Sequence, residues 1–262
     1  MVKSGDKVAF MGDSITAQGW GNAAGYVKLV VAGLAANGVE VTPIPAGNSG
    51  NKSNDMLARL DRDVLSKKPQ WMTLSCGVND VGHGKRGVPL DDAQAAAQTY
   101  DKNNAKEPDK GTYEKNIAQI VDQVQAAGVK LVVLTATVIQ EDLGNTENQR
   151  LAPYNDFLRK LAKEKSLPLA DLNALFQAQI KAANQPGKKL FTVDGVHMNT
   201  EGNKIMAAGV LQAFGFDAEQ IKKAREAWAP LEVQAAENAQ KATEAKARAD
   251  AEKAAAATPV PK

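Results

Sequence analysis

The first residue with a type and position suited to chemistry is a serine that directly follows a short apolar run. Ser14 stands in the tripeptide Gly12-Asp13-Ser14, after the predicted strand of residues 7–12. A serine there lies at the carboxyl edge of a sheet, with its hydroxyl open to a cleft. If a helix begins at the same point, the backbone N–H of Ser14 is an unpaired donor. Ser14 is therefore the candidate nucleophile.

Such a hydroxyl needs a base, and the chain has only two histidines. His197 follows Asp194 by three residues, so one turn can bring the carboxylate to the imidazole. Imidazole is the side chain that most readily exchanges a proton near neutral pH. We expect His197 to be the base and Asp194 to orient it. His83, in a glycine-rich loop, is either a group that contacts substrate or an exposed loop residue.

Acyl transfer also needs donors that face the developing oxyanion. Gly50 ends the turn segment Asn48-Ser49-Gly50 after the second predicted strand, and glycine offers an unhindered backbone N–H. Asn79, in Gly77-Val78-Asn79-Asp80, brings a side-chain amide to the end of the third strand. Each segment alone is common loop material, but together with Ser14 they predict one site at one sheet edge.

Four further residues are candidates for substrate binding: Asp13, Trp20, Asp80 and His83. For Asp13 the alternative is a brace of the Ser14 turn through local hydrogen bonds, and for Asp80 a brace of the Asn79 turn. Trp20 either stacks on a sugar or acyl group or packs on its own helix. No histidine has metal-ligand partners at zinc-like spacing, and no phosphate-binding loop is present, so we expect neither metal nor cofactor.

Strands and helices alternate along the chain and position these residues. Apolar runs predict strands over residues 7–12, 39–45, 71–75, 131–135 and 167–170. Continuous apolar runs are typical of strands buried on both faces. Helices are predicted over residues 23–37, 53–67, 112–127, 148–165, 172–183 and 200–214, and near 91–98 in the polar segment 82–111. The pattern predicts an α/β fold, a three-layer sandwich with a parallel sheet of about five strands.

From Asp217 onward the composition changes to alanine, glutamate and lysine. We expect a catalytic domain over residues 1–216 and a partly flexible helical extension over 217–262. Pro230 is expected to divide the extension into a packed helix, 218–228, and a solvated helix or frayed tail. The alternative is a coiled-coil or docking segment, which the missing stripe of large apolar residues disfavours.

The overall composition excludes several classes of protein. The net charge is +2 and the basic residues are scattered, so no nucleic acid or anionic membrane is expected as a partner. No run is long and apolar enough for a transmembrane helix. The single cysteine, Cys76, allows no internal disulfide and is expected to be a small buried residue. A cytoplasmic location and export with a removed leader both stay open.

Taken together, the motifs resemble the conserved blocks of the SGNH hydrolases, the esterase superfamily also called GDSL. The segment GDSIT, residues 12–16, resembles the first block, with Ile15 in place of the usual leucine. Gly50 resembles the glycine of the second block, and GVND, residues 77–80, the third. DGVHMNTEG, residues 194–202, resembles the last, with Met198 where proline or leucine is common. The resemblance covers about residues 6–216.

The resemblance implies a fold, a mechanism and a substrate class. The fold is that of SGNH hydrolases, and the nucleophile, base and orienting acid are Ser14, His197 and Asp194. The oxyanion hole consists of the Ser14 and Gly50 backbone N–H groups and the Asn79 amide. Single-domain bacterial members include carbohydrate acetylesterases. The resemblance therefore implies a serine esterase that acts through an acyl-enzyme and removes short acyl groups, such as acetyl, from a small or polymeric carbohydrate. The resemblance favours a secreted or periplasmic location.

Two alternatives stay open. The first keeps the catalytic set in a lysophospholipase or acyl-thioesterase. The second is a carbohydrate-binding protein that has lost the activity, which the intact catalytic set disfavours. The sequence does not predict an oligomeric state.

Overall fold

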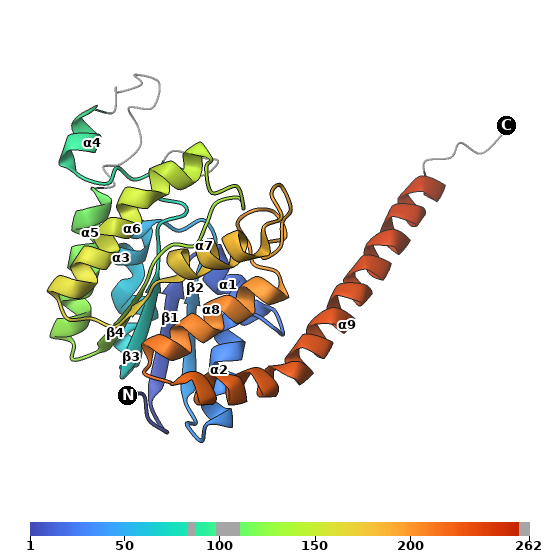
Figure 1. Ribbon diagram of the computed structural model, residues 1–262, viewed down its shortest axis with the longest axis horizontal. Coiled ribbons are helices and arrows are strands. Elements are labelled where there is room, and N and C mark those ends of the chain that lie inside the picture. The colour runs from blue at the N-terminus through green and yellow to red at the C-terminus, as the bar shows by residue number, and fades with distance from the viewer. Residues whose placement is uncertain (83–86, 98–110, 257–262) are drawn as a thin grey trace.

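The computed structural model describes residues 1–82, 87–97 and 111–256 and contains one parallel sheet. Its strand order is β2-β1-β3-β4-β5 (Figure 1). The strands are β1 (Lys7–Gly12), β2 (Thr42–Gly47), β3 (Trp71–Ser75), β4 (Lys130–Leu134) and β5 (Leu169–Ala170). This confirms the predicted parallel α/β sheet.

Helices cover both faces of the sheet and form the outer layers (Figure 1). The helices are α1 (Ser14–Gly21), α2 (Tyr26–Ala36), α3 (Ser53–Asp63), α4 (Asp92–Ala97), α5 (Tyr113–Ala126), α6 (Thr146–Glu164), α7 (Leu172–Ala183), α8 (Thr200–Ala213) and α9 (Ala218–Ala256), with a 3₁₀ turn, η1 (Leu65–Lys67). One layer contains α3, α5 and α6, and the other contains α1, α2, α7, α8 and the start of α9.

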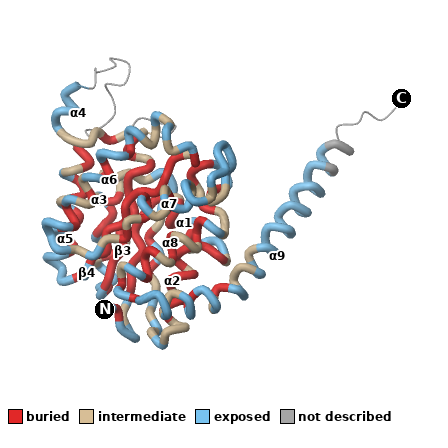
Figure 2. The backbone as a smooth tube through the Cα atoms, viewed as in Figure 1, coloured by how far each residue is buried: buried red, intermediate tan, exposed pale blue. Residues whose placement is uncertain are grey.

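The core lies between these layers and is built from the strands and the apolar faces of the helices (Figure 2). Residues of β1 from Val8 to Met11 have no exposed surface, as do Val132 and Val133 of β4. Helix α5 shows the expected amphipathic pattern, because the residues predicted to share its apolar face are all buried. They are Tyr113, Ile117, Ile120, Val121 and Val124.

The second strand begins later than its sequence predicts. Gly38 has a φ of +78° after α2, and the Val39 N–H donates to the Leu34 carbonyl oxygen. This capping turn draws Val39 into the end of the helix, so β2 starts only at Thr42, which pairs with Lys7 of β1. The β-rich composition of residues 39–41 does not distinguish a capping turn from a strand.

Pro230 does not interrupt the C-terminal helix, contrary to the expectation, but burial still divides the segment into a packed part and an exposed part. Helix α9 continues through Pro230 to Ala256. Its first turns pack against α2 and end in the buried Trp228, whereas its second half extends away from the domain with exposed side chains (Figures 1 and 2). In the described ranges, no helix has the length and apolar character needed to cross a membrane.

The strand order places three loops at one point of the sheet edge. After β1 the chain adds β2 on one side and then β3 on the other, so β1 lies between them. Ligands of open parallel sheets bind beyond the carboxyl ends of the strands where the strand order reverses in this way. The loops that carry Ser14, Gly50 and Asn79 follow these three strands.

Candidate active site

Ser14 is the first residue of helix α1, directly beyond the carboxyl end of β1. Asp13 caps this helix, because its Oδ1 accepts a hydrogen bond of 2.9 Å from the Ile15 N–H. Among the described residues, the Ser14 N–H has no acceptor, as the geometry of a helix start requires. The sequence therefore folds into a turn that exposes both the Ser14 hydroxyl and a free backbone donor.

A chain of hydrogen bonds connects Ser14 with His197 and Asp194, which come about 180 residues later in the sequence. The His197 Nε2 lies 2.8 Å from the Ser14 Oγ, and the His197 Nδ1 lies 2.6 Å from the Asp194 Oδ2. Asp194 Oδ1 also accepts the backbone N–H groups of Val196 and His197, at 2.9 and 2.8 Å. The carboxylate is thus fixed by its own turn while it holds the imidazole toward the serine.

The surroundings of Asp194 keep it ionised. Partial burial raises its pKa, but the hydrogen bonds from the His197 ring and from the His197 and Val196 N–H groups outweigh this and lower the pKa to about 2. The Asp194 side chain is half exposed and that of His197 about a quarter exposed. The arrangement can remove a proton from the serine hydroxyl and stabilise the charge that forms on the ring.

Asn79 connects the serine turn to the Gly50 turn. Its Nδ2 donates to the Asp13 Oδ2 at 3.3 Å and to the Asn51 carbonyl oxygen at 3.1 Å. Gly50, which precedes Asn51, has a φ of +78° in an exposed turn, a conformation that favours glycine. Within the described chain its N–H has no acceptor. Asn79 thus joins the Ser14 turn, through Asp13, to the residue that follows Gly50.

Asp13 and Asp80 are almost fully buried and contact protein groups. Asp80 accepts the Ser53 N–H at 2.9 Å and lies 3.2 Å from the Cys76 Sγ. Burial raises the pKa of Asp80, and burial together with the neighbouring Asp80 carboxylate raises the pKa of Asp13 to about 6. With 2% and 1% exposure, these carboxyls have no surface for a substrate. Of the two roles expected from the sequence, bracing the turns fits their positions.

The remaining candidates are Trp20 and His83. Trp20, in α1, is partly buried against the core, and the Lys28 Nζ lies 5.7 Å from its ring centroid. This position fits the packing role that was one of its two expected roles. His83 lies outside the described residues. Within the described ranges, no three His, Cys, Asp or Glu side chains are grouped to hold a metal ion.

Comparison with known proteins agrees with this geometry. A family model described as the GDSL-like Lipase/Acylhydrolase family matches residues 10–205. The chain belongs to this family. It is 26% identical over 230 residues to an acetylxylan esterase of Geobacillus stearothermophilus. The alignment covers 82% of this chain and 97% of that protein. The GDSL family membership makes the chain a carboxylic ester hydrolase.

Solved structures extend the comparison to the fold. The crystal structure of the Geobacillus stearothermophilus acetylxylan esterase matches with a TM-score of 0.64 and 25% identity over 82% of this chain and 97% of that one. Variants of that esterase described as catalytic mutants replace a serine or an aspartate by alanine. A second acetylxylan esterase matches with a TM-score of 0.64 and 30% identity, covering 79% of this chain and 98% of its own. The SGNH hydrolase fold is thereby confirmed.

Sequence reasoning missed an arginine beneath this GDSL site. Arg59 of α3 is 6% exposed, and its guanidinium donates to the Gly12 and Ala46 carbonyl oxygens at 2.9 Å each. Its Nε donates to the Asn51 Oδ1 at 2.6 Å, and Nη1 lies 3.0 Å from the Asp63 Oδ2. One side chain therefore joins the ends of β1 and β2 to the Gly50 turn. The available signal was a cation on the apolar face of a predicted helix.

A second missed residue holds the segment that leads into Asp194. The Glu141 carboxylate accepts the backbone N–H groups of Leu190, Phe191 and Thr192, at 2.7 to 2.9 Å, and the Thr192 hydroxyl at 2.7 Å. These contacts fix the residues that lead into the Asp194 loop. Within that loop, the Val193 N–H donates a hydrogen bond of 2.9 Å to the His197 carbonyl oxygen. Nothing in the local sequence distinguishes Glu141 from a solvated loop glutamate.

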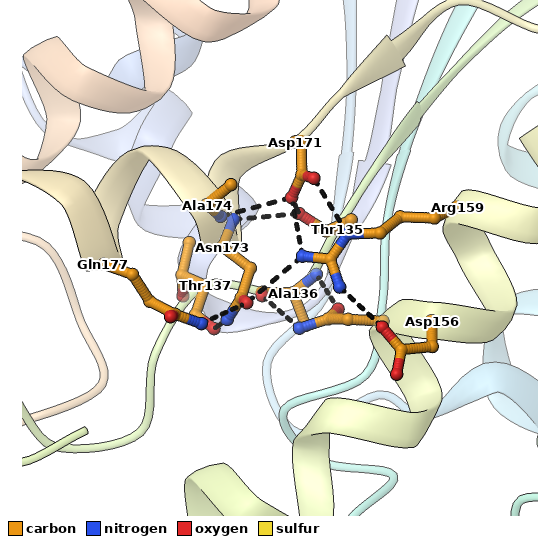
Figure 3. Close-up of polar contacts among 10 residues, drawn as sticks. Thr135, Ala136, Thr137, Asp156, Arg159, Asp171, Asn173, Ala174 and Gln177 are labelled. Atoms are coloured by element: carbon orange, nitrogen blue, oxygen red, sulfur yellow. Dashed lines mark hydrogen bonds and ion pairs between the residues drawn. The ribbon is translucent and has the colours of Figure 1, made fainter. Parts of the chain in front are cut away.

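A separate polar network ties the ends of β4 and β5 to helices α6 and α7 (Figure 3). Arg159 donates to both oxygens of Asp171, at 2.8 and 2.9 Å, and to Asp156 at 2.8 Å. Asp171 also accepts the Thr135 hydroxyl at 3.0 Å and caps α7. The Arg159 guanidinium and the Asp171 carboxylate are thus paired with protein groups, and the network fixes this edge of the sheet.

Proposed function

We propose that the chain cleaves carboxylic esters through an acyl-enzyme, with Ser14 as nucleophile. The observation that carries this proposal is the hydrogen-bonded line from the Ser14 Oγ through His197 to Asp194. His197 Nε2 takes the hydroxyl proton while the Ser14 Oγ attacks the ester carbonyl carbon. When the carbon–oxygen bond to the alcohol breaks, the same nitrogen returns the proton to the leaving alkoxide. A water molecule then attacks the acyl carbon while His197 takes its proton. The bond to the Ser14 Oγ breaks, the serine takes the proton back, and the carboxylic acid is released.

We propose that three donors stabilise the tetrahedral oxyanion. The free backbone N–H groups of Ser14 and Gly50 supply two, and the Asn79 amide supplies the third. The 3.3 Å contact from Asn79 to Asp13 is the longer of its two hydrogen bonds. Asn79 can therefore share this N–H with an oxyanion at small cost, and catalytic hydrogen bonds often shorten only when the transition state forms.

The proposed substrate is a carbohydrate that carries short acyl groups, most simply acetyl groups. Support comes from the two similar acetylxylan esterases, one of which aligns over 97% of its own length. The exposure of His197 and Asp194 also supports it, because an open site admits a bulky, branched alcohol.

A release assay across three substrate classes tests this proposal. Purified protein is given acetylated xylan, acetylated monosaccharides and lysophospholipids, and released acid is measured. We expect acetate release from the carbohydrates and none from the phospholipid. Initial rates on p-nitrophenyl acetate, octanoate and palmitate provide a second measurement, with the acetate ester fastest. A maximum at the long acyl chains would instead assign the catalytic set to a lysophospholipase or thioesterase.

A further inference from the structure

A groove of about 540 Å³ lies beside the loop of Asp194 and His197, between the domain and the middle of α9. Asn22, just beyond α1, is on one wall, and Asn238, Ala239 and Ala242 of α9 form the opposite wall. Its volume is in the range of sites that hold a small ligand. The family match ends at residue 205, so the α9 wall lies outside the part of the chain that the family defines.

The groove adjoins the loop that carries Asp194 and His197. Val193 and Met198 line the groove, and these residues directly flank the segment from Asp194 to His197. Thr192 and Met198 form an isolated antiparallel bridge, and the loop between them contains Val193, Asp194 and His197. Val193 is 64% exposed, which leaves an apolar contact surface next to the catalytic acid.

Three polar side chains on the groove are free to bind a ligand. Asn22 and Thr200 have no side-chain partner in the described structure, and the Asn238 Nδ2 is likewise free, since only its Oδ1 is used by Gln234. Two other amides, Asn199 and Asn203, are fully occupied by helix capping and loop contacts. The free groups are therefore one hydroxyl and two amides, spread over both walls.

The side chains that line the groove indicate which kind of ligand it can bind. No ionisable side chain is among the described residues that line the groove, so it matches a neutral ligand. Amides and a hydroxyl above an apolar base of alanine, valine and methionine suit sugar rings, which present hydroxyl groups at their edges and C–H groups on their faces. A phosphate or carboxylate would find no cation there.

We infer that this groove binds the neighbouring sugar residues of a polysaccharide whose acylated residue is at Ser14. The inference rests on the proposed function and extends it, because it makes α9 one wall of the substrate site. We expect a small ester to occupy only the space at Ser14, without contact to α9. The contribution of α9 therefore appears only with longer carbohydrate chains.

Two double variants of α9 test this inference. Ala239→Leu with Ala242→Leu fills the groove, and Gln240→Leu with Ala247→Leu is the matched control on a face turned about 120° away. The groove alanines and both control residues are exposed, and leucine keeps the helix propensity while offering no ring for a sugar to stack on. Calorimetric titration with xylo-oligosaccharides that carry no acetyl group measures binding, because an esterase cannot cleave them.

We expect the groove variant to weaken binding of long oligosaccharides about tenfold, whereas the control binds like the wild type. On acetylated xylo-oligosaccharides its kcat/KM should fall by the same factor, with p-nitrophenyl acetate hydrolysis unchanged in both variants. Equal binding by the two variants, or no binding by the wild type, overturns the inference. If the groove variant weakens sugar binding while the wild type releases no acetate from the acetylated sugars, that result contradicts the proposed substrate but supports sugar binding in the groove.

Discussion

At the residue scale, the Asp13 carboxyl is buried and, among the described residues, forms no salt bridge with lysine or arginine. It receives one hydrogen bond from the Ile15 N–H and a longer one from Asn79, and the buried Asp80 carboxyl is near. Burial is the largest cause that raises its pKa to about 6. A raised pKa means that the folded protein holds the proton more tightly than the unfolded chain does. The ionised form of Asp13 therefore opposes folding.

This predicts a pH dependence of stability that Asp13→Asn removes. The stabilising effect of the protonated Asp13 is complete below the unfolded pKa near 4 and is lost as the pH rises through about 6. Between about pH 4 and pH 8, the free energy of unfolding of the wild type should fall relative to the variant by up to about 3 kcal/mol. Urea unfolding of both proteins at several pH values measures it. A difference that stays constant with pH contradicts the prediction.

Asn79→Ala tests the third oxyanion donor. Removal of one such donor usually lowers kcat by about 10²–10³-fold, because the hydrogen bond is made to the transition state. We predict this loss on p-nitrophenyl acetate, with KM nearly unchanged. Asn54→Ala is the control on the neighbouring helix α3, since in the described part of the chain the Asn54 side chain forms one hydrogen bond, to Asp55. An unchanged kcat with a raised KM would make Asn79 a residue that binds the ground state.

The sequence predicted the residues whose chemistry is local. Asp194 and His197 are three residues apart, and Ser14 directly follows a strand, so short-range rules were sufficient to nominate them. Arg59 and Glu141 act on backbone groups from distant segments, such as the Gly12 carbonyl and the Phe191 N–H. Such partners depend on the tertiary fold, and no spacing in the sequence indicates them.

At the element scale, Arg59 holds the ends of two strands and one catalytic turn together. Arg59→Ala leaves the Ala46 carbonyl and Asp63 without their buried partner, so we predict a loss of about 3 kcal/mol in the free energy of unfolding. Arg62→Ala is the matched control, because Arg62 binds the same Asp63 but its side chain is 75% exposed. An exposed pair contributes less than about 1 kcal/mol.

The same pair of variants separates stability from catalysis. At a temperature where both remain folded, Arg59→Ala should also lower kcat on p-nitrophenyl acetate, since the Asn51 side chain next to Gly50 loses its anchor. Arg62→Ala should keep the wild-type kcat. Equal unfolding free energies and equal kcat values for the two variants would show that Arg59 has no positioning role.

The ends of a helix were predicted well where a clear apolar face defines it. Helix α5 has a clear apolar face and was placed within a residue of its observed ends. The start of β2 and the course of α9 were not, because in each a tertiary or capping contact overrides the local preference. Pro230 lacks an N–H for the helix, yet the turns before it pack against α2 and the helix continues, with a change of direction beyond the packed turns (Figure 1).

At the scale of the whole molecule, we propose that residues 1–216 form the catalytic domain and that 217–262 form an extension anchored to it. The anchor is Trp228, which is fully buried and donates its indole N–H to the Leu29 carbonyl oxygen at 2.8 Å. Trp228→Ala should lower the free energy of unfolding by about 3–5 kcal/mol. Val233→Ala, on the same helix but 60% exposed, should change it little. Similar values for both would contradict the anchoring role.

The central claim is that Ser14 is acylated during turnover, and Ser14→Ala tests it most directly. The variant lacks only a hydroxyl at the start of α1, so its circular dichroism spectrum and melting temperature should match those of the wild type. We predict that its kcat on p-nitrophenyl acetate falls by several orders of magnitude. A folded Ser14→Ala protein that retains wild-type esterase activity would contradict the mechanism.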